Sequence, residues 1–163
     1  MPCMDIHIFA VGGTIDKIYF DAASEFKVGE PQIGELLHEA NVTFNYQVES
    51  LMRKDSLEMT DEDRQLIREA VAACPTERIL ITHGTDTMAD TARALMGVEG
   101  KAVVLTGAMQ PARLRVSDAI FNIGFAIGAL QQVDHGIYVA MNGQVFEPAN
   151  LKKNRSAHRF EVS

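Results

Sequence analysis

Short apolar runs alternate along the chain with segments whose apolar residues recur every three or four positions. The runs and one alternating segment predict strands, at 6–11, 42–48, 78–81, 102–105 and 137–141. Helical spacing and helix-start residues predict helices, at 30–40, 60–74, 88–97 and 117–130. Strands that alternate with helices of this length indicate βαβ units and a parallel sheet.

The predicted sheet is covered by helices on both faces, because the strand at 102–105 is apolar at every position instead of alternating. We therefore predict an α/β fold with a doubly wound, mainly parallel sheet in three layers, of the flavodoxin-like or Rossmann-like kind. The chain has 163 residues and shows no internal repeat or linker, so a single domain over 1–163 is expected.

Two segments lack a clear period. Residues 14–29 are predicted to form a long loop, and their polar and small residues suit a mobile flap that closes over a substrate. The chain from about residue 146 onward is polar and aperiodic. Its basic run at 152–155 is typical of a solvated surface.

Composition and charge narrow the class of protein. A formal net charge of -7 argues against a nucleic-acid or membrane surface, since both need a basic patch. Two cysteines form no disulfide framework, and neither they nor the histidines have the spacing of a metal site. The first residues lack the features of a signal peptide, and the apolar stretch at 119–130 is too short to span a bilayer. A cytoplasmic protein without a bound metal is expected.

Three loops that leave predicted strands pair glycine with threonine, at 12–14, 83–87 and 106–109. The carboxyl ends of parallel strands meet where α/β proteins bind ligands, so these loops are the candidate site. Glycine lets the backbone come close to a ligand, and hydroxyl and N–H groups at a helix start stabilise an anion or oxyanion. The sequence contains neither a P-loop nor a dinucleotide fingerprint.

These loops carry a family resemblance. Residues 11–15 (VGGTI) and 81–88 (ITHGTDTM) resemble the two signatures of the bacterial-type L-asparaginase family, and 104–111 (VLTGAMQP) is similar to a third segment of that family. The match runs in the family's order over essentially the whole chain. It implies hydrolysis of L-asparagine to L-aspartate and ammonia, with glutamine as a side substrate and with no metal or cofactor.

The resemblance also implies roles for individual residues. The catalytic group that the resemblance implies comprises the nucleophile and its proton-transfer partners: Thr14, Thr85, Asp86 and Lys153. Tyr19 is added to this catalytic group from the residues of the predicted flap, as the candidate lid phenol. The substrate-binding group comprises a serine for the α-carboxylate and three residues of close backbone approach: Ser56, Gly13, Gly84 and Ala108. Lys152 stays open as an alternative to Lys153. His83 is expected to make a structural hydrogen bond instead of acting as a base.

The chemistry of these residue types supports that assignment. A free hydroxyl is a poor nucleophile and needs a proton acceptor nearby. A lysine can accept a proton only if burial lowers its pKa, while Asp86 would act in the opposite direction. Thr85, Asp86 and Lys153 are therefore expected to work as one proton-transfer network, with N–H groups after Thr85 stabilising the oxyanion.

The chain departs from the family in two ways. Family members are about twice as long, and their smaller C-terminal domain holds the substrate's amino group, so we expect a short form that lacks this domain and assembles as a homodimer or homotetramer. The family's lid tyrosine is replaced by Phe26, which leaves Tyr19 either as its substitute or as a packing residue at the loop base. A non-catalytic amino-acid-binding or interaction module, and an amidohydrolase for a related amide, are the alternative hypotheses.

Overall fold

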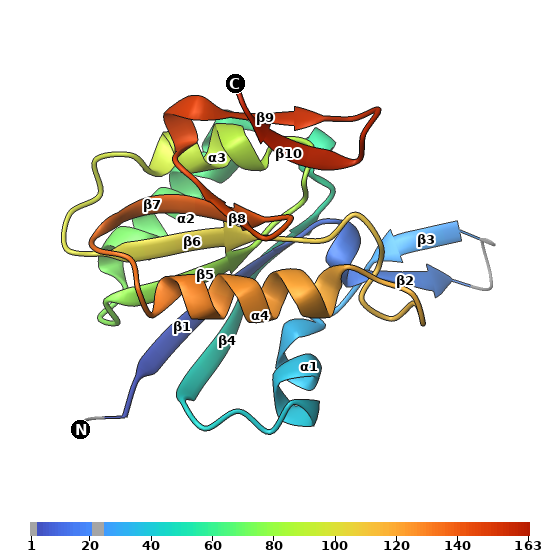
Figure 1. The fold of residues 1–163 in the computed structure, drawn as a ribbon, viewed down its shortest axis with the longest axis horizontal. Coiled ribbons are helices and arrows are strands. Elements are labelled where there is room, and N and C mark those ends of the chain that lie inside the picture. The colour runs from blue at the N-terminus through green and yellow to red at the C-terminus, as the bar shows by residue number, and fades with distance from the viewer. Residues whose placement is uncertain (1–2, 21–24) are drawn as a thin grey trace.

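The central sheet of the computed structural model, which describes residues 3–20 and 25–163, has six strands in the order β4-β1-β5-β6-β7-β8 (Figure 1). Five of them are mutually parallel: β1 (Asp5–Gly12), β4 (Asn45–Lys54), β5 (Arg78–Thr82), β6 (Ala102–Thr106) and β7 (Gly136–Met141). The edge strand β8 (Gln144–Phe146) is antiparallel to β7 and follows a turn at Asn142 and Gly143, both with positive φ. Such a turn suits the twist of a tight hairpin.

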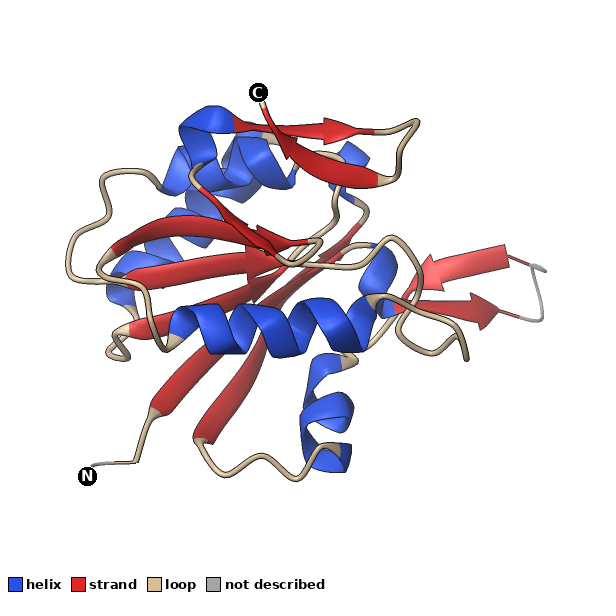
Figure 2. Ribbon diagram, viewed as in Figure 1, coloured by secondary structure: helices blue, strands red, loops and turns tan. Residues whose placement is uncertain are grey.

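Helices cover both faces of this sheet, as Figure 2 shows. One apolar cluster joins the strands to α2 (Asp61–Ala73) and α3 (Met88–Leu95). A second cluster, on the other face, joins them to α1 (Ile33–Glu39) and α4 (Ala119–Leu130). The predicted three-layer α/β fold is thus confirmed, and the buried apolar runs are the strands that carry both clusters.

The order of the strands indicates where this sheet would bind a ligand. The chain runs from β1 outward to β4 and then crosses to β5 on the other side of β1. If the five parallel strands are numbered 1 to 5 along the chain, their order across the sheet is 2-1-3-4-5, which is the flavodoxin-like order. The carboxyl ends of β1 and β5 border the topological switch point, where open α/β sheets bind their ligands.

The starts of α2 and α4 differ in how they are capped. The capping box at Thr60 and Asp63 is present, with the Asp63 N–H donating to Thr60 Oγ1 and the Thr60 N–H donating to Asp63 Oδ2. Asp118 precedes α4 but does not cap it. Its carboxylate accepts the N–H groups of Met109 and Gln110 and so holds the loop after β6.

Residues 14–29 are not a long loop, so that prediction is wrong. A 3₁₀ turn η1 (Thr14–Asp16) leads into an antiparallel hairpin of β2 (Lys17–Phe20) and β3 (Glu25–Val28), which projects away from the sheet in Figure 1. The hairpin packs few side chains against a core, so no apolar alternation marks its strands. The part of the predicted flap at 21–24 lies outside the described residues.

The chain after residue 146 is also more ordered than predicted. A 3₁₀ turn (Pro148–Asn150) is followed by a hairpin of β9 (Leu151–Asn154) and β10 (Arg159–Val162). Leu151 and Phe160 anchor this hairpin in the core beside α3. Among the described residues, no helix is both long and apolar enough to cross a membrane.

Candidate active site

Close contacts between backbones bring the loops after β1 and β5 together. A Cβ atom on Gly13, whose φ is 90°, would lie 2.4 Å from the backbone nitrogen of Gly84. A Cβ atom on Gly84 would lie 2.5 Å from the Cβ atom of Ser56. Both positions therefore require glycine, because any side chain would force the loops apart. The contact of Gly13 with Gly84 sets their chain neighbours, Thr14 and Thr85, on adjoining loops at the switch point.

Lys153 reaches into this site from the β9–β10 hairpin. Its Nζ atom donates to Thr85 Oγ1 at 2.8 Å and to Asp86 Oδ1 at 2.7 Å, although 67 residues separate the lysine from the aspartate. The side chains of Lys153 and Asp86 are 16% and 27% exposed. Lys152 is exposed, so the structure brings Lys153 to the two loop residues. The predicted solvated surface at 152–155 is therefore wrong for this lysine.

Ser56 lies against the same loop. It is 2% exposed and begins the 3₁₀ turn η2 (Ser56–Glu58) after β4. Its Oγ accepts the N–H of Asp86 at 3.1 Å, and its carbonyl accepts the hydroxyl of Thr87 at 2.7 Å. The Asp86 N–H predicted for an oxyanion is thus engaged within the protein. The Ser56 hydroxyl can still donate its hydrogen to a carboxylate, since it acts as an acceptor in this bond.

Three predicted site residues have less specific surroundings. Thr14 is half-buried at the start of η1, directly after β1. Ala108 is buried in the loop after β6. Tyr19 is 54% exposed in β2, with its ring edge-on to Phe26 at a centroid distance of 5.6 Å. It does not pack at the base of the segment, and the structure places it beside Phe26, on the arm of the hairpin.

His83 is a structural residue. Its Nδ1 lies 2.7 Å from the carbonyl oxygen of Gly84, and its Nε2 lies 2.8 Å from Thr91 Oγ1, which accepts the Nε–H of Arg64. Burial lowers the pKa of His83 to about 4. The ring is therefore neutral at pH 7, and these contacts suit an Nδ1–H that donates to Gly84. The expected structural hydrogen bond of His83 is present.

Asp16, like Lys153, is less exposed than the sequence pattern predicts. A solvated flap is expected there, but Asp16 is 2% exposed and its Oδ1 accepts the N–H of Gln32 at 3.0 Å. Burial raises the pKa of Asp16 to about 7, against the opposing effects of the Gln32 hydrogen bond and the charge of Arg53. No local pattern in an aperiodic segment signals such a carboxyl.

The raised pKa of Asp16 predicts a specific pH dependence of stability. Between about pH 4 and pH 7 the folded state holds a proton that the unfolded Asp16 has lost, so the free energy of unfolding falls as pH rises through this range. The expected fall is a few kcal/mol, because each tenfold difference in proton affinity between the two states corresponds to about 1.4 kcal/mol. His83 acts in the opposite direction, because its pKa is lowered from 6.5 to about 4 and stability rises across that interval.

Asp16→Asn isolates the contribution of Asp16. We expect the variant to gain stability relative to the wild type as pH rises from 4 to 7 and to keep a constant difference above that range. Chemical denaturation at several pH values measures both curves. A difference that does not change with pH would show that Asp16 titrates as an exposed carboxyl.

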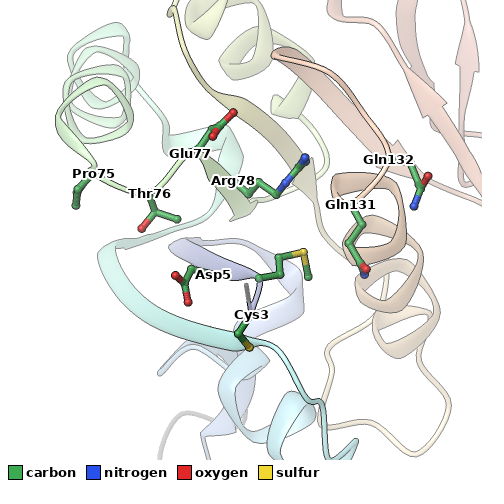
Figure 3. Close-up of a pocket in the computed structure, with 9 residues that line it drawn as sticks. Cys3, Asp5, Pro75, Thr76, Glu77, Arg78, Gln131 and Gln132 are labelled. Atoms are coloured by element: carbon green, nitrogen blue, oxygen red, sulfur yellow. The ribbon is translucent and has the colours of Figure 1, made fainter. Parts of the chain in front are cut away.

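The amino end of the sheet carries a separate polar cavity of about 620 Å³, shown in Figure 3. Two of its charged side chains are engaged within the protein: Arg78 donates to the Leu130 carbonyl, and Asp5 accepts from Asn45. This cavity is at the opposite end of the strands from Thr85 and Lys153. Within residues 3–20 and 25–163, no three His, Cys, Asp or Glu side chains are grouped to hold a metal ion.

Comparisons with known proteins agree with this geometry. A family model described as asparaginase, N-terminal, matches residues 5–161. The chain is 34% identical over 160 residues to a probable periplasmic L-asparaginase of Haemophilus influenzae, covering 91% of this chain and 46% of that protein. It is 28% identical over 163 residues to a glutaminase-asparaginase of Pseudomonas fluorescens biotype A, covering 91% and 45%.

Among solved structures, the thermostable L-asparaginase from Thermococcus kodakarensis superposes with a TM-score of 0.83 at 27% identity. The alignment covers 98% of this chain and 51% of that one. The chain therefore spans about half the length of the relatives it matches. The resemblance found in the sequence is confirmed, and so is the fold.

Proposed function

We propose, from the premise that the chain belongs to the asparaginase family and matches its N-terminal domain, that it hydrolyses L-asparagine to L-aspartate and ammonia through a threonine nucleophile. The observation that carries the proposal is the contact of Lys153 Nζ with Thr85 Oγ1 and Asp86 Oδ1 at the switch point. The relatives named above are L-asparaginases and a glutaminase-asparaginase, which directs the proposal to a side-chain amide.

The proposed reaction has two steps. The Thr14 hydroxyl oxygen attacks the carbon of the side-chain amide, and the carbon–nitrogen bond of that amide breaks. The amide NH₂ group takes up the hydroxyl proton and leaves as ammonia, so that Thr14 carries the acyl group as an ester. Water then attacks the resulting ester, which releases L-aspartate and restores the Thr14 hydroxyl. These steps use side chains alone, with no metal or cofactor.

Proton transfer in this scheme runs through Thr85. Its Oγ1 accepts a hydrogen bond from Lys153, so its own hydrogen remains to be donated toward the reacting groups. Lys153 Nζ also donates to Asp86 Oδ1, so the carboxylate holds the lysine against Thr85. Thr85, Lys153 and Asp86 thus form one hydrogen-bonded group, which we assign to proton transfer.

Substrate binding is proposed for the groups beside this network. The Ser56 hydroxyl would donate to the α-carboxylate, and the backbones of Gly13, Gly84 and Ala108 would line the amide. Asp86 makes its ion pairs among the described residues through Oδ1, with Lys153 and with Arg155 at 3.5 Å. Its second oxygen is the group we assign to the substrate's ammonium.

Ammonia release from purified protein tests this function. The panel comprises L-asparagine, L-glutamine and simple amides of similar size, with calorimetric binding measured in parallel. Faster release from L-asparagine than from the other amides supports the proposal. Ammonia release from glutamine or another amide, but not from L-asparagine, would make that amide the substrate. Binding of an amino acid without ammonia release would favour a non-catalytic binding module.

Further properties of the protein are proposed on the same basis. We propose that residues 1–163 form one domain, that the domain acts as a homodimer or homotetramer, and that it resides in the cytoplasm without nucleic-acid or membrane partners. A neighbouring subunit would cover the site and exclude water, which strengthens electrostatic stabilisation. Light scattering measures the oligomeric state.

Tyr19 is proposed as the lid phenol. The β2–β3 hairpin begins directly after η1, so its closing would bring Tyr19 toward Thr14. Tyr19→Phe keeps the ring contact with Phe26 and removes only the hydroxyl, and we expect kcat to fall by about 10²-fold. Adding Phe26→Tyr to this variant restores a phenol across the hairpin and should recover part of the rate. Steady-state kinetics that show an unchanged kcat for Tyr19→Phe would contradict this role.

A further inference from the structure

Asp16 connects three segments around the turn that carries Thr14. Its N–H donates to the Gly13 carbonyl at 3.1 Å, and its carbonyl accepts the N–H of Gly29, at the far end of the β2–β3 hairpin, at 2.9 Å. Its carboxyl Oδ1 accepts the N–H of Gln32, the residue before α1, at 3.0 Å. One buried residue therefore joins the start of the turn, the return of the hairpin and the entry to α1.

The partner of the carboxyl is itself held in place. Gln32 is 5% exposed, and its side chain donates to the Glu30 carbonyl at 2.8 Å while accepting the Nε–H of Arg113 at 2.8 Å. The N–H of Ala112 donates to the Ile15 carbonyl at 3.0 Å. The loop after β6 is thus tied to the same turn.

The Asp16 carboxyl is the acceptor for the buried N–H of Gln32. The charge that acts on it comes from a neighbouring segment: Arg53 on β4, which pairs with Glu30. Arg113 contacts the side chain of Gln32 and not Asp16. If the carboxyl were removed, the Gln32 N–H would remain buried without its acceptor. An unsatisfied buried donor is costly, so the start of α1 would move to find another partner.

We propose that Asp16 is a positioning residue for Thr14, whose buried carboxyl fixes the turn and the base of the β2–β3 hairpin against the start of α1. The inference rests on the proposed function, in which Thr14 is the nucleophile. A hydroxyl that attacks a carbonyl must be held close to the reactive geometry, and a misplacement of about 1 Å can cost about 10²-fold in rate. Asp16 supplies this hold two residues from the reacting oxygen, without touching the substrate.

Two substitutions separate positioning from charge. Asp16→Asn keeps an Oδ1 acceptor for the Gln32 N–H, and we expect kcat to stay within about 3-fold of the wild type. Asp16→Ala removes the acceptor, and we expect kcat to fall by about 10²-fold with a much smaller change in KM. Thr60→Ala is the control for stability alone, because it removes the cap of α2 and should leave kcat unchanged.

An equal loss of kcat in Asp16→Asn and Asp16→Ala would overturn the proposal, since the charge of the carboxyl would then be what matters. A wild-type kcat in Asp16→Ala would overturn it as well. Hydrogen exchange gives a readout without activity: peptides that contain Gly29 and Gln32 should exchange faster in Asp16→Ala and at the wild-type rate in Asp16→Asn. If the wild type releases no ammonia, the proposed function fails, whereas unchanged exchange in Asp16→Ala refutes the positioning role.

Discussion

Thr14→Ala is expected to lower kcat for ammonia release from L-asparagine by about 10³-fold or more, because in the proposed mechanism Thr14 alone forms the acyl intermediate. Thr14 begins the turn directly after β1, and the contact of Gly13 with Gly84 sets it beside the loop that holds Thr85. Substrate binding should persist, since Ser56 and Asp86 are unchanged. Single-turnover kinetics and calorimetric titration with L-asparagine measure the two properties separately.

Thr14→Ser is the matched control for this prediction. It keeps the hydroxyl and loses the methyl group that restricts χ1, so we expect a loss of only about 10-fold. Circular dichroism shows whether each variant is folded. Equal ammonia release by the wild type and Thr14→Ala would refute the threonine nucleophile, and the absence of release from both would refute the enzyme proposal.

The central fold could be predicted from the sequence because its strands are buried by helices on both sides. Residues 102–105 form an unbroken apolar run, and β6 is buried at every position. The two small hairpins could not be predicted in this way. The β9–β10 hairpin is anchored by Leu151 and Phe160, one residue in each strand, and a single buried residue in a strand produces no period. Asn142 and Gly143 were an available signal for the turn before β8.

The sequence indicates the candidate site in part through its glycine and threonine loops and in part through the family resemblance. The loops are visible locally because each directly follows an apolar strand. The pairing of Lys153 with Asp86 depends on where the chain returns after β7, so spacing alone could not choose between Lys152 and Lys153. No sequence pattern marks Asp16, because its burial depends on Gln32, which lies sixteen residues further along the chain and directly before α1.

Lys153→Met is expected to lower kcat by about 10²-fold or more, and Thr85→Val and Asp86→Asn should have effects of the same size. Lys153 Nζ contacts both loop residues, so any one substitution would interrupt the proposed proton path. The double and triple variants should therefore lose little beyond the single ones. Double-mutant cycles on kcat measure this coupling, and losses that simply multiply would contradict a shared path.

The stability of these variants shows whether a loss of kcat comes from lost catalysis or from lost folding. Arg155 lies 3.5 Å from Asp86 Oδ1, so Lys153→Met leaves the carboxylate with a second cation instead of unpaired. Removing one partner of a buried pair is costly mainly because the remaining charge is left alone, and this variant avoids most of that cost. We therefore expect Lys153→Met to remain folded while its kcat falls. Lys152→Met, at the exposed neighbour, should change neither property, and a loss of activity in that variant alone would transfer the role to Lys152.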